Sequence, residues 1–409
     1  MTVWRATLGP TPTVCFLCAT FCLGIAFGCS KPSEKLGKSE TKEGGPSAPP
    51  LRDASVLLEH FASPSLRCSE CHGEIATEWR TSAHATADRT PLFRAMRAAA
   101  GQSSCDGCHA PIRSRILPDD PAAADAIGCD ACHLMTDIVP KREGMGFALR
   151  LDDTTRYGPL CDAKNHYFHK MGCSPIHGRS QMCSACHLYY LSTANGPLAI
   201  FTEYEEWEKS RHASGSECQD CHMPSRVAAA AAGARVRGLS SHDFRPDIRR
   251  EAIQMKVALE ENPQGELEGV VSLLHNGAGH SVPTGLPEHR IVLRVALHDA
   301  SQTKTQEWER TYGRVLVDDR GREAPFYRAT RIEKDTRIAV DETRIERFPL
   351  RVSTGGELVA TLEWHRVSAR IADELRVERD VVQLVSGRLR FAAPREGHVT
   401  LPKPVTAKP

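Results

Sequence analysis

Apolar and polar residues alternate along much of the C-terminal part of the chain, from about residue 251. The alternation is clearest in five segments bounded by Gly, Pro or Asp: GVVSLLH (269–275), RIVLRVAL (290–297), GRVLVDD (313–319), RIERFPLRV (344–352) and LVATLEWHRV (358–367). A period of two is typical of strands with one buried face, and turn residues between them favour antiparallel pairing. We therefore predict a β-sandwich domain at 251–398 and a disordered proline-rich tail at 399–409.

The segment 56–250 lacks this regular alternation of apolar and polar residues. PLFRAMRAAAG, from Pro91 to Gly101, predicts one helix that begins near its proline and ends at its glycine. Elsewhere we expect mostly short helices and loops, with an alanine-rich link after CHMP (221–224). The fold class predicted for the whole chain is thus multidomain: a mostly α or irregular N-terminal module followed by an antiparallel β-sandwich.

The first 29 residues contain an apolar run, VCFLCATFCLGIAFGC, downstream of Arg5. Such a run predicts an export signal rather than part of the fold. It ends in a small residue followed by Cys29, which favours a lipoprotein-type signal peptide with a lipid anchor at Cys29; an ordinary signal peptide and an uncleaved anchor are the alternatives. The polar residues 30–55 predict a flexible tether. We expect an exported protein anchored to the cell envelope, facing the periplasm or the outer membrane.

The composition of the chain limits which partners it can bind and what its core can be made of. The 52 basic and 51 acidic residues nearly cancel and form no basic stripe, so nucleic-acid binding is not expected. Only 6% of the residues are aromatic. Part of this protein must therefore build its core from something other than side chains.

Cysteine supplies the missing component. Five Cys-x-x-Cys-His motifs occur: CSECH (68–72), CDGCH (105–109), CDACH (129–133), CSACH (183–187) and CQDCH (218–222). Two cysteines on one turn can form thioethers to the vinyl groups of a haem, and the following histidine can bind its iron as proximal ligand. The expected cofactor is five covalently attached haems c. The thioether residues are Cys68, Cys71, Cys105, Cys108, Cys129, Cys132, Cys183, Cys186, Cys218 and Cys221, and the proximal ligands are His72, His109, His133, His187 and His222.

Zinc sites and structural disulfides are the alternatives for these pairs. Zinc needs two pairs per metal, which five pairs cannot supply, and neither alternative requires a histidine after every second cysteine. Cys161 and Cys173 lie outside the motifs and are expected to form a disulfide, because an exported protein is in an oxidising compartment.

Histidines outside the motifs are candidates for the second axial position. The sequence Glu-Trp-x-x-Ser-x-His-Ala occurs twice beside a motif, at 78–85 and 206–213, and offers His84 and His212. SSHDFRP offers His242, and GAGHSVPTG offers His280 on a glycine-rich turn. Between the third and fourth motifs, His169 and His177 are favoured over His166. These are six candidates for five irons, so the individual pairings stay open.

The segments EWRTSAHA, GPLCDAKNHYFHK, SPIHGRSQMCSACH, EWEKSRHASGSECQDCHMP and GAGHSVPTGLPEHR together resemble exported multihaem c-type cytochromes. The resemblance is to relatives of the tetrahaem cytochrome that accepts electrons from hydroxylamine oxidoreductase, and covers roughly 56–370. It implies bis-histidine haems in a helical pentahaem module at 56–250 and an appended β-sandwich. It also implies that His84, His212, His242 and His280 are distal ligands, with His169 or His177 as the fifth.

Two functions follow from this cofactor hypothesis. Closely packed haems with two histidine ligands each suit electron transfer in respiration, because they offer no open site for substrate. We therefore expect an electron carrier with redox proteins as partners. The alternative is an enzyme, a multihaem reductase or oxidase of a small nitrogen or sulfur species at one five-coordinate haem, with the second or third motif as the place for it. A third option is that the β-sandwich binds a partner or surface and the haems serve it.

Overall fold

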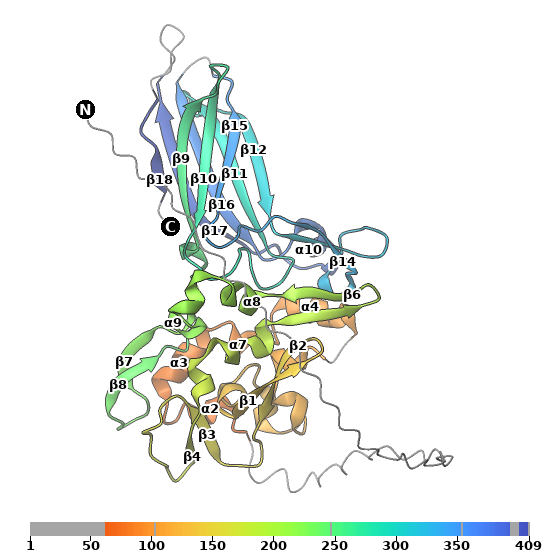
Figure 1. The fold of residues 1–409 in the computed structure, drawn as a ribbon, viewed down its shortest axis with the longest axis vertical. Helices are drawn as coiled ribbons and strands as arrows, with labels where there is room; N and C mark the ends of the chain where they lie inside the picture. The colour runs from red at the N-terminus through yellow and green to blue at the C-terminus, as the bar shows by residue number, and fades with distance from the viewer. Residues whose placement is uncertain (1–61, 102–103, 246–247, 353–354, 393–400, 408–409) are drawn as a thin grey trace, which may run out of the picture. The chain divides into compact units, whose positions relative to one another are not determined.

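Two four-stranded antiparallel sheets make up the C-terminal part of the computed structural model (Figure 1). The first has the order β15-β10-β9-β18 and contains β9 (Ile253–Glu261), β10 (Leu267–His275), β15 (Thr343–Pro349) and β18 (Val405–Ala407). The second has the order β12-β11-β16-β17 and contains β11 (Arg290–Asp299), β12 (Lys304–Tyr312), β16 (Gly356–His365) and β17 (Val381–Phe391). We call residues 253–407 the two-sheet region.

Both sheets contribute to one apolar core. Val257 and Leu273 come from the first sheet and Leu293 and Leu362 from the second, and all four side chains are fully buried. Burial alternates along the strands, as in β9, because successive side chains point to opposite faces. The five segments predicted as strands are confirmed, four within these sheets and the fifth as β13 (Arg314–Val317), which pairs with β14 (Arg331–Asp335). A helix, α10 (Ala369–Leu375), lies between β16 and β17.

The structure describes residues 62–392 and 401–407 except 102–103, 246–247 and 353–354. The predicted signal peptide, the lipid anchor at Cys29 and the tether at 30–55 lie outside these residues. The prediction of a disordered tail at 399–409 is wrong for Val405–Ala407. These residues form β18, which pairs with β9, because Ala407 is buried in the shared core and Val405 packs against it.

All five Cys-x-x-Cys-His motifs lie in residues 62–251, which we call the motif region. Its α-helices are short, as predicted: α2 (Ser65–Cys68), α3 (Gly73–Thr81), α4 (Pro91–Ala100), α5 (Asp106–His109), α6 (Cys129–His133), α7 (Ser180–His187), α8 (Glu203–Glu208) and α9 (Cys218–His222). The helix predicted at Pro91–Gly101 is confirmed as α4. Thr90 accepts a hydrogen bond from the Phe93 backbone N–H at 3.2 Å, and Gly101 ends the helix with a left-handed φ of 62°.

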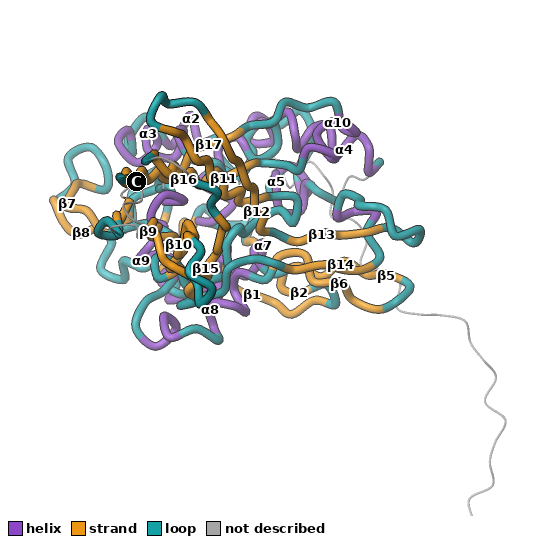
Figure 2. The backbone as a smooth tube through the Cα atoms, turned by 90° about the horizontal axis from the view of Figure 1, so that it is seen from above, coloured by secondary structure: helices purple, strands orange, loops and turns teal. Residues whose placement is uncertain are grey.

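The motif region also contains strands that the sequence pattern did not predict. One sheet has the order β1-β2-β5-β6, from β1 (Met135–Lys141), β2 (Gly144–Leu149), β5 (Tyr189–Thr193) and β6 (Gly196–Phe201). A parallel pair joins β3 (Thr155–Gly158) to β4 (Lys170–Cys173). The predicted alanine-rich link is instead a hairpin of β7 (Ser225–Ala229) and β8 (Val236–Ser240). Loops still connect most of the short elements (Figure 2).

Side chains alone give the motif region little core. The clusters formed wholly within it hold five and three buried apolar residues, against 26 in the core of the two-sheet region. The described residues of both regions belong to one compact unit. None of the described helices is long and apolar enough to cross a membrane.

Candidate haem centres

Three of the five motifs lie wholly on helices, whereas the first begins at the end of α2 and continues in a turn. The third and fifth motifs are themselves the one-turn helices α6 and α9, and the fourth forms the C-terminal end of α7. A helical turn brings the cysteines at i and i+3 to the same side, as two thioether bonds to one porphyrin require. None of the ten motif cysteines is in a disulfide.

Three of the motif histidines are oriented by backbone carbonyls. The Nδ1 atoms of His72, His109 and His133 lie 2.6, 2.8 and 2.7 Å from the carbonyl oxygens of Ala230, Ala87 and Tyr157. If each Nδ1–H donates to its carbonyl, Nε2 carries the lone pair that binds a metal. Burial lowers the pKa of His109 and of His133 below the usual value, which keeps both rings neutral, the form that can ligate.

Three pairs of histidine rings face each other across a gap of one size. The centroids of His72 and His169, of His133 and His242, and of His222 and His280 are each 6.3 Å apart. The planes of these pairs differ by 27°, 24° and 16°. An imidazole nitrogen binds a metal at about 2 Å and lies about 1.1 Å from its ring centroid, so two rings on one iron have centroids about 6 Å apart. Each gap therefore fits a haem iron.

His84 and His212 are placed differently. Burial, and after it the positive charges that His187, His222 and His109 can carry, lower the pKa of His84 to about 3, so this ring lies near three motif histidines. The Nε2 atom of His212 is buried and has no hydrogen-bond partner among the described residues. Such an orphaned donor or acceptor costs free energy unless something binds it, which suits an iron ligand. Neither residue faces a proximal ring in a pair like the three above.

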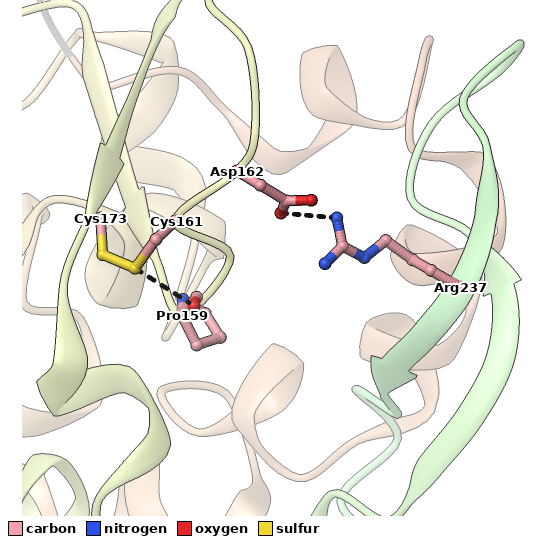
Figure 3. Close-up of a disulfide and its surroundings, with 5 residues drawn as sticks. All are labelled: Pro159, Cys161, Asp162, Cys173 and Arg237. Atoms are coloured by element: carbon pink, nitrogen blue, oxygen red, sulfur yellow. Dashed lines mark hydrogen bonds and ion pairs between the residues drawn. A yellow bond between two sulfur atoms is a disulfide. The ribbon is translucent and has the colours of Figure 1, made fainter.

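His169 lies on a loop closed by a disulfide. Cys161 and Cys173 are bonded, with Cα atoms 4.6 Å apart, which confirms the predicted bridge. Figure 3 shows Asp162, next to this bridge, directed at Arg237 of β8, with a separation of 2.8 Å. The same hairpin holds Ala230, the carbonyl partner of His72. The disulfide loop therefore carries one ring of the pair, and the β7–β8 hairpin contacts both this loop and the other ring.

Neighbouring motifs touch through their cysteines. Side-chain hydrogen bonds join Cys68 to Cys129, Cys108 to Cys186 and Cys183 to Cys218. The first raises the pKa of the Cys68 thiol above its usual value. The first motif thus adjoins the third, and the fourth adjoins both the second and the fifth. Groups attached to these cysteines would be close neighbours.

The structure does not support the zinc alternative. Within the described ranges, no three side chains of His, Cys, Asp or Glu converge in a group that could hold a metal ion. The histidine rings instead face one another across wide gaps in pairs. The donor set fits one iron between two imidazoles rather than a tetrahedral site.

Known proteins match the chain in part. Residues 67–134, which include the first three motifs, match the family model described as cytochrome c554 and c-prime. A solved penta-heme cytochrome c552 from Thermochromatium tepidum has a similar fold, with a TM-score of 0.64 and 21% identity. The match covers 80% of this chain and 99% of that one. No curated protein sequence matches. The comparisons support a multihaem c-type cytochrome.

His177 competes with His242 as the partner of His133, the histidine of the third motif. The His177 ring is 5.8 Å from the ring of His133, but its Nε2 lies 3.1 Å from the carbonyl oxygen of Cys132. A nitrogen that donates to a carbonyl cannot also bind iron. The Nδ1 of His242 lies 3.0 Å from the Ser240 carbonyl oxygen, which leaves its Nε2 free.

Substitution separates these two histidines. His242→Ala is expected to convert one haem to the high-spin form, whereas His177→Asn should keep every haem low-spin, because asparagine can still donate to Cys132. Electron paramagnetic resonance of the oxidised protein measures both. A high-spin haem in His177→Asn with an unchanged spectrum in His242→Ala would reverse the assignment.

Proposed function

We propose that this protein is a pentahaem electron carrier of the cell envelope, with bis-histidine ligation of its haems and a C-terminal β-sandwich. The observation that carries the proposal is the set of three facing histidine pairs. In each pair the two ring centroids are 6.3 Å apart. Each pair joins a motif histidine to one of the candidate distal histidines. The pairs are His72 with His169, His133 with His242, and His222 with His280.

Haem c, when bound, accepts and releases single electrons at its iron. The chain's own task is to hold each ring and exclude other ligands. Carbonyl oxygens orient three of the proximal rings, and the disulfide loop and the turn at 276–281 bring distal rings to two of the five. An iron with both axial sites filled has no open position, so these three centres favour electron transfer over substrate chemistry.

The remaining assignments complete the proposal. His84 and His212 would serve the centres of the second and fourth motifs, whose histidines have no facing ring at this spacing among the described residues. Redox proteins are the proposed partners, and lipidation of Cys29 the proposed means of attachment to a membrane. The alternative, a reductase or oxidase acting at one open haem, is not favoured by the comparisons.

Cofactor content and spin state test the proposal. The purified protein should give five haems c per chain in the pyridine haemochrome assay, fully low-spin spectra, and no binding of carbon monoxide after reduction. Fewer than five haems would refute the stoichiometry. A stoichiometric carbon monoxide complex in the native protein would refute the pure carrier and favour the enzyme.

A further inference from the structure

The repeated sequence Glu-Trp-x-x-Ser-x-His-Ala has equivalent local structure in both copies. The indole N–H groups of Trp79 and Trp207 each donate to a backbone carbonyl at 2.9 Å. Ser82 and Ser210 each accept a backbone N–H from the turn that carries the histidine, at 3.3 and 3.2 Å. The serine therefore has a local role in both copies, whereas the indole of Trp79 reaches a carbonyl 48 residues away. The glutamates, Glu78 and Glu206, also make distant contacts.

Each glutamate reaches a segment far away in the sequence. Glu78 Oε2 accepts the backbone N–H of His242 at 3.0 Å, across 164 residues. Glu206 Oε2 accepts the backbone N–H of Ser281 at 2.8 Å, across 75 residues, and Ser281 directly follows His280. His242 and His280 are the rings that face His133 and His222. Each carboxylate thus accepts a backbone N–H at or directly after one of these two histidines.

An arginine holds the other oxygen of each carboxylate. Oε1 of Glu78 lies 2.5 Å from Nε of Arg226, and Oε1 of Glu206 lies 2.8 Å from a terminal nitrogen of Arg337. The two glutamate side chains are only 21% and 18% exposed, so solvent screens these ion pairs weakly. Oε1 thus lies against a guanidinium in both residues, and in Glu206 it also accepts the Thr202 hydroxyl at 2.7 Å, while Oε2 is directed at the distant N–H.

We propose that Glu78 and Glu206 are positioning residues, each of which holds the distal histidine of a haem other than the one served by the histidine of its own repeat. This inference rests on the proposed bis-histidine ligation. His242 and His280 lie in irregular chain, where no strand or helix fixes the peptide. A charge-assisted hydrogen bond to a carboxylate supplies the missing restraint. One copy of the repeat therefore shapes two neighbouring centres.

Isosteric and truncating variants of the holoprotein test the proposal. In Glu206→Gln the side-chain shape is kept but the charge is lost, and we expect five haems, a folded protein and a shifted low-spin resonance from one haem. In Glu206→Ala we expect that same haem to become partly high-spin. Glu78→Gln and Glu78→Ala should act in the same way on a different haem.

Two reference variants identify the haem affected. The resonance changed in the Glu206 variants should be the one lost in His280→Ala, and that changed in the Glu78 variants the one lost in His242→Ala. Glu208→Gln is the matched control, because this glutamate is exposed, lies on the same helix α8 as Glu206, and accepts no such N–H. This control should leave all resonances in place.

Two results would overturn the inference. If His280→Ala and His242→Ala each alter one haem while the glutamate variants alter none, or alter only the haems of His212 and His84, the glutamates have no positioning role. If His280→Ala and His242→Ala alter no haem, the proposed ligation fails and the inference fails with it. A lower melting temperature with every resonance intact would mean that the glutamates only stabilise the fold.

Discussion

Replacement of His280 by alanine is expected to convert one of five haems from low-spin to high-spin and to create one carbon monoxide site per chain. The reason is geometric: the ring of His280 faces that of His222 at 6.3 Å with a 16° angle between planes. With alanine there, the iron held by His222 would keep only its proximal ligand. Electron paramagnetic resonance and carbon monoxide titration of the reduced protein measure the two effects.

The same substitution should loosen the contact between the two-sheet region and the motif region. His280 belongs to the first of these and His222 to the second, so a shared iron would cross-link them. Faster hydrogen exchange at 276–285 is the expected result. His166→Gln is the control, since His166 is exposed and faces no proximal ring. Unchanged spectra in His280→Ala would mean that this histidine is only part of a turn.

Replacement of Cys183 and Cys186 by alanine is expected to have the largest effect of all. The fourth motif touches the second through Cys186 and Cys108, and the fifth through Cys183 and Cys218. A porphyrin is far larger than a leucine side chain, whose removal from a core already costs about 2–5 kcal/mol. Domains are stable by only about 5–15 kcal/mol. We therefore expect the chain to lose more than one haem and to accumulate poorly.

The first motif provides the comparison. Cys68 contacts one other motif, the third, through Cys129. Alanine at Cys68 and Cys71 should therefore cost one haem of five and leave a folded protein with a lower melting temperature. Haem per chain and thermal unfolding of both variants measure the difference. Equal losses of haem and of thermal stability in the two variants would contradict a central place for the fourth motif.

The sequence was sufficient wherever structure depends on neighbours along the chain. The spacing of cysteine and histidine identified the motifs, and alternation identified β10, β11 and β16, because both patterns repeat within one turn or one strand. The capped helix α4 was predicted for the same reason. The strand β12 was not predicted, because its side chains are mostly exposed and its apolar and polar residues alternate only weakly. The β7–β8 hairpin was not predicted, because its run of alanines resembles a linker.

Long-range pairings could not be predicted. His169 faces a ring 97 positions earlier, and no local pattern distinguishes it from His177. The sequence shows that Glu78 belongs to a repeated motif, but it does not identify His242 as the contact of this glutamate. That contact depends on how distant segments of the chain fold together. Backbone carbonyl partners such as that of Ala230 cannot be predicted from the side chain, because any residue has a carbonyl group.

The bridge between Cys161 and Cys173 also sets a condition on how the chain matures. Under the proposed function, ten of the twelve cysteines in the described part of the chain must stay reduced until a vinyl group reaches them, while these two must be oxidised. A premature bond within any Cys-x-x-Cys pair would block cofactor insertion there. The assembling cell must therefore sort thiols by position, oxidising one pair and sparing five.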